Sequence, residues 1–217
     1  MAGTPDPVVV LLTLALLALA PFIAIMVTSF AKVVIVLALV RNALGLQQIP
    51  PNLVLNGLAL VLSIHIMAPL ATQLAERAER SPSANQMQAS SLFQMLSEAR
   101  EPLRAFLRKH AQPRERDFFV KSAQQLWPAE LAQTLTPDDL MVLVPAFTVS
   151  ELTAAFKIGF LLYLAFVIID LVVANILVAL GMMMFSPTIV AVPLKLLLFV
   201  LLDGWSSLIH GLILTYR

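Results

Sequence analysis

Charged residues interrupt the apolar C-terminal third of this 217-residue sequence, and they are the first candidates for chemistry. Glu151, Lys157, Asp170, Lys195 and Asp203 all stand within or beside long apolar runs. A charged side chain that faces lipid costs several kcal/mol, so such groups usually face a bundle interior, a water-filled cavity or one another. We expect these residues to lie inside a helical assembly, where carboxylates could move protons or form structural pairs.

Two interpretations of the intramembrane carboxylates follow from their chemistry. Asp170 and Asp203 together with His65 could form a proton or ion relay, because carboxylates and imidazole pass protons inside membrane bundles. The structural interpretation is favoured, because the sequence lacks the paired half-helix pattern of a transporter. Glu151 and Lys195 have opposite signs near the starts of two apolar runs, and we predict an ion pair between them that could join neighbouring copies.

The run from Gly181 to Pro187, Gly-Met-Met-Met-Phe-Ser-Pro, is the most unusual link between apolar segments. Methionine is flexible and polarizable, so Met182, Met183 and Met184 from several copies around an axis could close a pore and deform around different polypeptides. An apolar constriction of this kind also excludes water and ions. The alternative is ordinary packing of the turn against a neighbouring helix, which composition by itself favours.

Neither catalysis nor cofactor binding has support in the sequence. The chain contains no cysteine, no G-x-S-x-G, no H-E-x-x-H and no phosphate-binding glycine loop. His65, His110 and His210 stand far apart, without the spacing of metal ligands. A formal net charge of +1 gives no basic surface for nucleic acid. We predict a protein that is not an enzyme and that binds no metal, cofactor or nucleic acid.

Long apolar helices must position these residues. Hydrophobic residues make up 59% of the chain and charged residues 12%, and the mean hydropathy is +0.89, far outside the usual composition of a soluble domain. A helix of roughly 20 apolar residues crosses a bilayer core. Runs of suitable length cover residues 8–40, 53–70, 158–180 and 192–215. We predict an all-α integral membrane protein with about four long hydrophobic helices that form helical hairpins.

The first run contains Pro21, where a ring replaces the backbone N–H, so we expect either one long helix or two pieces broken near that residue. Ala-Leu-Ala at 18–20 is similar to a signal-peptidase site. No Lys or Arg precedes Lys32, however, so we expect the first helix to be retained. The few basic residues in the links place both termini and the central insert outside the cytoplasm.

A charged segment, 71–139, separates the second run from the third. It holds nine basic and nine acidic residues, and we predict a water-exposed, periplasmic helical insert. Apolar residues at helical spacing predict an amphipathic helix: Leu92, Met95, Leu96, Ala99, Leu103, Phe106 and Leu107. We also expect a loop over 81–91, a kink or division at Pro102 and a short helix over 118–127. The predicted divisions are hydrophobic helices 1 and 2 at 1–70, the insert at 71–139, and helices 3 and 4 with the Met-rich loop at 140–217.

An ordered series of short motifs resembles the FliP/SctR family of flagellar and injectisome export gates. The resemblance covers about residues 21–70 and 140–210, and it is stronger to the injectisome branch. Ala165 departs from the pattern, since the family commonly has proline there. The motifs are TSFAK at 28–32, LVRNALG at 39–45, PPN at 50–52, VPAFTVSEL at 144–152, AFKIGF at 155–160, IDLVV at 169–173, GMMM at 181–184, PLKL at 193–196 and LDGW at 202–205.

The resemblance implies a ring of five copies around a channel for unfolded secretion substrates, in the bacterial inner membrane with parts in the periplasm. It also implies three kinds of partner: a small two-helix subunit of the FliQ/SctS type, a related larger subunit of the FliR/SctT type and an export switch protein of the FlhB/SctU type. Assemblies of this kind can lift apparent membrane helices out of the bilayer plane.

The same resemblance gives roles to individual residues. Methionine loops of the family form a gasket that seals the closed channel, and this role falls on Met182, Met183 and Met184. Neighbouring subunits are joined by an ion pair whose positions match Glu151 and Lys195. Asp170 and Asp203 are then structural polar residues inside the helical assembly. An ion- or proton-coupled transporter that uses these two aspartates is the alternative function.

Overall fold

The computed structural model describes residues 7–80 and 89–217, which form helices and, within these ranges, no strand. The all-α prediction is therefore confirmed. In chain order the helices are α1 (Pro7–Val27), α2 (Phe30–Ala43), α3 (Asn52–Arg80), α4 (Ala89–His110), α5 (Pro113–Leu126), α6 (Ala129–Ala132), α7 (Leu140–Ala179), α8 (Pro187–Leu201) and α9 (Gly204–Leu214).

The first apolar run forms two helices, but the division lies after Pro21 and not beside it. α1 continues through Pro21 to Val27, and α2 begins at Phe30. The N–H of Phe30 donates to Oγ1 of Thr28 at 3.3 Å, so a local hydroxyl satisfies a backbone group at the start of the new helix. Of the two alternatives for this run, one long helix or two pieces broken near Pro21, the second is right in giving two helices but wrong in the position of the break, because apolar helices of membrane proteins tolerate proline in their interior.

Two described helices are long and apolar enough to cross a membrane. They are α3 over Asn52–Glu76 and α7 over its full length, Leu140–Ala179. The pair α8 and α9 passes the same test together, although the two helices meet at a bend of 63°. The membrane character is confirmed. The third apolar run was predicted to begin at residue 158, but the helix that contains it, α7, begins 18 residues earlier, at Leu140.

The chain groups into two compact units, each built from separated segments. Unit 1 contains the chain up to Ala31 together with Met67–Glu151, and unit 2 contains Lys32–Ile66 together with Leu152–Arg217. α3 and α7 each contribute residues to both units. The predicted divisions follow hydropathy along the chain and remain a prediction.

The core of unit 1 joins α4 to the beginning of α7. Leu107 of α4 and Ala111, which directly follows α4, are buried against Leu143 and Phe147. The ring of Phe106 packs at a tilt against that of Phe147, with centroids 5.6 Å apart. Leu103, Phe106 and Leu107 therefore form the expected apolar face. The side chains of the other four predicted members lie outside the described residues: Leu92, Met95, Leu96 and Ala99.

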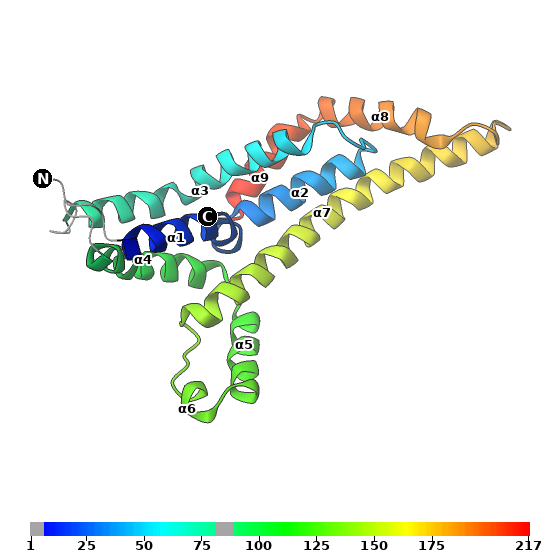
Figure 1. Ribbon diagram of the computed structural model, residues 1–217. Coiled ribbons are helices and arrows are strands. Elements are labelled where there is room, and N and C mark those ends of the chain that lie inside the picture. Colours follow the sequence, from blue (N-terminus) through cyan, green and yellow to red (C-terminus); the bar gives the residue numbers. More distant parts are fainter. Residues whose placement is uncertain (1–6, 81–88) are drawn as a thin grey trace, which may run out of the picture. The chain divides into compact units, whose positions relative to one another are not determined.

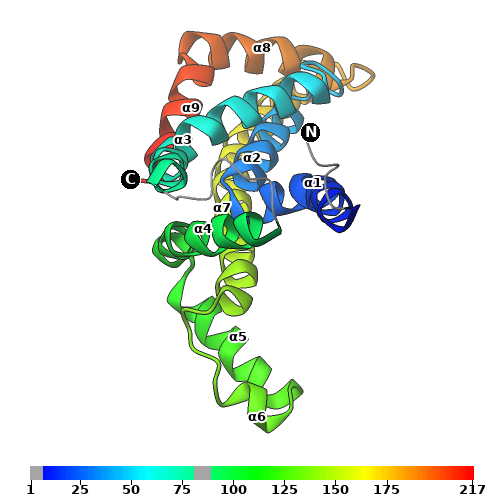
Figure 2. The same cartoon turned by 60° about the vertical axis from the view of Figure 1, so that its left-hand side comes forward.

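The rest of the charged insert is helical, with boundaries that differ from the predicted ones. α4 continues through Pro102 without division, and α5 begins five residues before Phe118 because Pro113 occupies its first turn. Figure 2 shows α5 and α6 as successive short helices, and they follow α4 and precede α7 in the chain. Of the predicted loop over 81–91, residues 81–88 lie outside the described residues, and the remainder belongs to α4.

Unit 2 is built on a buried stripe along α2. Val33, Val36, Leu37 and Val40 are buried at helical spacing. Gly159 of α7 lies directly against the side chain of Leu39, so a larger residue at this point would push the two helices apart. The sequence of α2 is apolar on all sides of the helix, so packing against α7 determines which face is buried.

α7 and α8 form a helical hairpin within unit 2. Figure 1 shows α8 turning back along the C-terminal part of α7 from a loop at their common tip. Val173 and Leu177 of α7 are buried together with Ala191 of α8. This hairpin positions both the methionine loop and the intramembrane charges.

Candidate pore loop and intramembrane charges

The methionine loop exists because α7 is terminated by a Schellman motif. Gly181 has φ +75°, a left-handed conformation that glycine adopts without steric cost. The N–H of Met182 donates to the carbonyl of Leu177 at 2.9 Å, and the N–H of Gly181 donates to Val178 at 3.0 Å. These two bonds are the pair that defines the motif, and they fix where the helix stops.

The loop is short because α8 starts at once. The N–H of Phe185 donates to the carbonyl of Met182 at 3.1 Å, which closes a turn, and Pro187 occupies the first turn of α8. The methionines therefore lie on a tight connection between α7 and α8.

The methionine side chains point away from the chain. Met183 is 80% exposed and Met184 is fully exposed, whereas Met182 and Phe185 are partly covered. The packing alternative required a neighbouring helix, and no helix of the described chain covers Met183 or Met184. Bare methionines at the tip of a hairpin are available to another molecule.

Lys195 is buried in unit 2 and is held by two acceptors. Its Nζ donates to Oδ2 of Asp170 at 2.5 Å and to the carbonyl of Ala43 at 3.0 Å. Ala43 is the last residue of α2, so the ammonium group lies at the negative end of that helix dipole. The side chain of Lys195 is 5% exposed, while that of Asp170 is 44% exposed. The carboxylate of Asp170 is therefore paired with Lys195 through Oδ2, and part of it stays exposed at the surface of the chain.

Glu151, the predicted partner of Lys195, is buried and belongs to unit 1, whereas Lys195 belongs to unit 2. Within the chain, the cation is matched by Asp170. The pairing of Glu151 with Lys195 therefore remains a prediction, and it concerns contacts between copies.

Asp203 has a backbone role at the bend between α8 and α9. Its φ of +47° places it in the left-handed region, and its carbonyl accepts the N–H of Ser207 at 3.0 Å. His65 is exposed on α3. Among the described residues, neither Asp203 nor His65 forms a side-chain hydrogen bond or ion pair with Asp170. The relay of these three residues therefore stays an alternative prediction.

One charged contact was missed by the sequence analysis. Nζ of Lys32 lies 3.6 Å from the centroid of the Tyr216 ring, and Lys32 is buried. This cation–π contact joins the start of α2 to the end of α9. The signal in the sequence was an isolated lysine in an apolar run, which indicates a satisfied cation but does not identify its partner.

Comparison with known proteins gives a consistent result over nearly the whole chain. The model of the FliP family matches residues 13–212. The chain is 55% identical to the hypersensitivity response secretion protein HrcR of Ralstonia nicotianae over 93% of each chain. It is 51% identical to the Yop proteins translocation protein R of Yersinia pestis, over 100% of this chain and 99% of the relative. It is also 43% identical to the virulence protein YscR of Salmonella typhimurium, over 98% of each.

Proposed function

Because this chain belongs to the FliP family and is a membrane component of type III secretion, we propose that it forms the channel of the export gate. In this proposal several copies surround a path for unfolded substrates across the bacterial inner membrane. The family supplies a structural part of the secretion apparatus, so the chain provides the conduit, and other components supply the energy.

The exposed methionine loop carries this proposal. Met183 and Met184 are presented at a hairpin tip and are not covered by their own chain. Copies arranged around an axis would bring these tips together, and flexible thioether side chains would close the gap without a rigid fit. Such a constriction excludes water and ions when closed, and it deforms around polypeptides of different sequence when open.

The test is replacement of Met182, Met183 and Met184 together by alanine. We expect an intact complex on native electrophoresis and an increased ion leak across the inner membrane, because alanine side chains are too short to fill the constriction. Met141→Ala is the control, since Met141 is also exposed but lies at the start of α7. An unchanged leak in the triple variant, with secretion also unchanged, would remove the sealing role.

The contact between neighbouring subunits is proposed to include Glu151 of one copy and Lys195 of the next. The two residues have opposite signs, and their positions match those of the ion pair that joins neighbouring subunits in the family. Glu151→Lys and Lys195→Glu should each prevent assembly of the complex, and the double reversal should restore it in part. Loss of assembly in the double variant equal to that in the single ones would contradict this pair. A ring of five is the proposed stoichiometry, and mass measurement of the complex checks it.

The remaining partners are proposed from the same family membership. They are the small two-helix subunit of the FliQ/SctS type, the larger subunit of the FliR/SctT type and the switch protein of the FlhB/SctU type. The charged segment 71–139 is proposed to lie on the periplasmic side. Cross-linking from α5, whose surface carries several charged residues, would identify which partner covers it.

The comparisons do not favour the alternative, an ion-coupled transporter that uses Asp170 and Asp203. The relatives are secretion and translocation proteins, and Asp170 is held by Lys195 in the folded chain. A relay residue would be needed for transport but not for assembly. Asp170 instead has the contacts of a residue that stabilises the helix hairpin.

A further inference from the structure

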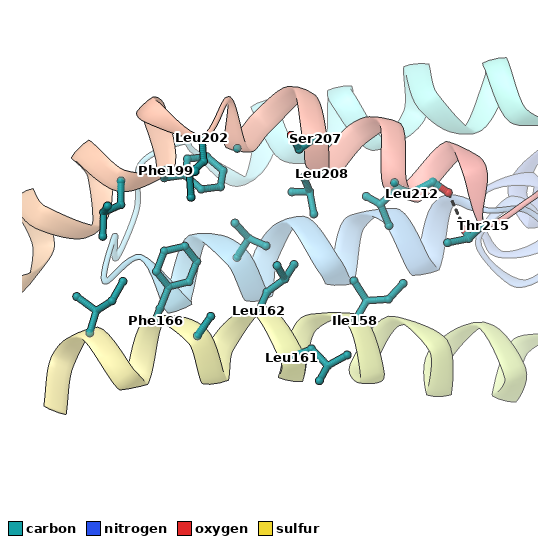
Figure 3. A pocket seen from close by; sticks show the side chains of 16 residues that line it. Ile158, Leu161, Leu162, Phe166, Phe199, Leu202, Ser207, Leu208, Leu212 and Thr215 are labelled. Atoms are coloured by element: carbon teal, nitrogen blue, oxygen red, sulfur yellow. Dashed lines mark hydrogen bonds between the residues drawn. The ribbon is translucent and has the colours of Figure 1, made fainter. Parts of the chain in front are cut away.

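Unit 2 contains an apolar cavity of about 700 Å³ between α7 and the pair α8 and α9. Figure 3 shows Ile158, Leu162 and Phe166 along one wall, with Leu208 and Leu212 on the other. Its volume lies within the range of roughly 300–1000 Å³ that is typical of small-ligand sites. The cavity is distinct from both the methionine loop and the Lys195–Asp170 pair.

Small residues keep the cavity open on both sides. Ala165 lies on the α7 wall, and Ser207 and Gly211 lie on the α9 wall. A Cβ atom added at Gly211 would meet nothing within 4 Å, so the space in front of it is unfilled. Phe199 closes one end, where its ring packs edge-on against Trp205 with centroids 5.4 Å apart. The cavity is therefore shaped by ordered side chains.

The length and chemistry of the lining match a single acyl chain. Along α7 the lining runs from Ile158 to Ile169, a rise of roughly 16 Å at 1.5 Å per residue. An extended acyl chain can lie along this length, and its hydrocarbon chemistry matches the apolar lining.

Exposed charge is distributed unevenly between the two ends of the cavity. Ile158 and Thr215 lie at the same end in Figure 3; Lys157 precedes Ile158, and Arg217 lies two residues after Thr215. Both basic residues are exposed. The acidic residues of unit 2, Asp170 and Asp203, adjoin Ile169 and Leu202 near the opposite end, where Lys195 is buried and paired with Asp170. Exposed cations thus adjoin one end, and the lysine near the other end is buried and paired.

We propose that this cavity binds one acyl chain of an anionic phospholipid, with the phosphate group at Lys157 and Arg217. The chain is a membrane protein, so lipid is present at high local concentration. The acyl chain fills apolar volume that would otherwise be empty, and the two cations select the charged headgroup. This lipid stabilises the packing of α9 against α7 independently of the sealing role of the methionines.

The test is to count bound lipid on the full chain, purified in mild detergent and delipidated, by native mass spectrometry with added dioleoylphosphatidylglycerol. We expect one tightly bound lipid. Gly211→Leu should fill the cavity and weaken binding roughly tenfold or more, a difference of about 1.4 kcal/mol. Ala165→Phe fills the same space from the α7 wall and should also weaken lipid binding roughly tenfold or more. With two variants, the test does not depend on either one folding correctly.

Gly57→Leu is the matched control, because Gly57 also has open space around its Cβ position but lies on α3, away from the cavity. It should bind lipid as the unmodified chain does. The double variant Lys157→Gln with Arg217→Gln should reduce the preference for phosphatidylglycerol over phosphatidylcholine roughly threefold or more, by loss of attraction between the cations and the phosphate.

Two outcomes would overturn the proposal. One is undiminished lipid binding in both cavity-filling variants, and the other is equal binding of the two phospholipids by the unmodified chain. A photoreactive group at Leu208 gives a further check, since transfer to lipid is expected. Transfer to a protein chain within the assembled complex would identify a partner helix as the occupant. Neither result depends on the leak measurement at the methionines.

Discussion

The charged segment from Arg100 to Asp139 and unit 2 distribute their side chains in opposite ways. In the charged segment, ion pairs such as Arg108–Asp138 at 3.1 Å lie at the surface, and Leu107 is buried. In unit 2, Lys32 and Lys195 are buried while large apolar residues are exposed, Phe160 and Leu161 among them. The first arrangement suits water, and the second suits lipid or neighbouring subunits.

The difference determines which interactions hold each region together. A region in water gains stability by burying apolar surface, and its exposed ion pairs contribute little. A region with apolar surroundings gains little from exposed apolar side chains, and its buried charges must be matched within the fold. Substitutions of the same chemical kind should therefore have different effects in the two regions.

The largest effect is expected from Phe147→Ala. Phe147, at the start of α7, is almost fully buried against Leu107 of the charged segment, and removal of a buried phenylalanine side chain lowers the free energy of unfolding by about 3–5 kcal/mol. Phe160→Ala on the exposed face of unit 2 should change it by less than about 0.5 kcal/mol in the isolated chain. Unfolding in detergent, followed by circular dichroism, measures both. Equal losses would contradict the division between the regions.

The next largest loss of stability is expected at the Lys195–Asp170 pair, and substitution of either partner should give a different loss. Asp170→Asn removes the negative charge opposite the buried ammonium group of Lys195, and it should destabilise by about 2–4 kcal/mol. Lys195→Met leaves a carboxylate that is 44% exposed, so it should cost less, about 1–2 kcal/mol. The double variant should be more stable than Asp170→Asn alone, as measured by a double-mutant cycle.

The matched control is the surface pair Arg108–Asp138. Both side chains are partly exposed, so Arg108→Met should change the free energy of unfolding by about 0–1 kcal/mol. A cost as large as that of Asp170→Asn would mean that burial does not separate the two kinds of ion pair. The same unfolding measurement applies.

Helix class and the position of the methionine loop followed from local sequence, because both depend on short-range features. Gly181 supplies the left-handed residue that ends α7, and Pro187 starts α8. The break at Thr28 was missed because a single hydroxyl outweighs the more obvious proline at position 21.

Charge partners could not be predicted in the same way. The sequence gives the signs of Glu151, Asp170 and Lys195, but only packing decides which helix faces meet. Lys195 lies against Asp170 because α8 folds back along α7, and it also reaches the end of α2. The contact of Lys32 with Tyr216 likewise joins helices far apart in the chain. Such long-range pairs depend on tertiary geometry, for which apolar helices offer few sequence signals.

A pH-dependent effect is expected where the charged segment meets α7, at Asp139. Its Oδ2 accepts the N–H of Thr136 at 2.7 Å and the hydroxyl of Thr136 at 2.9 Å. The backbone hydrogen bond from Thr136 is the main cause that lowers the pKa of Asp139 below its ordinary value of 3.8, and nearby arginines add to it. The ionised carboxylate is therefore the form that the fold stabilises.

The sign of the pH dependence follows from this lowered pKa. The stabilisation is fully present above the ordinary value near 3.8 and is lost as the pH falls through the lower value of the folded state. Asp139→Ala should destabilise by about 1 kcal/mol at neutral pH, as loss of a hydrogen-bonded side chain does. This difference from the unmodified chain should shrink in acid below pH 3.8, when unfolding is measured in detergent at each pH. Thr136→Ala removes the hydroxyl but keeps the N–H, so it should have a smaller effect, and a larger one would show that the backbone bond is not the main cause.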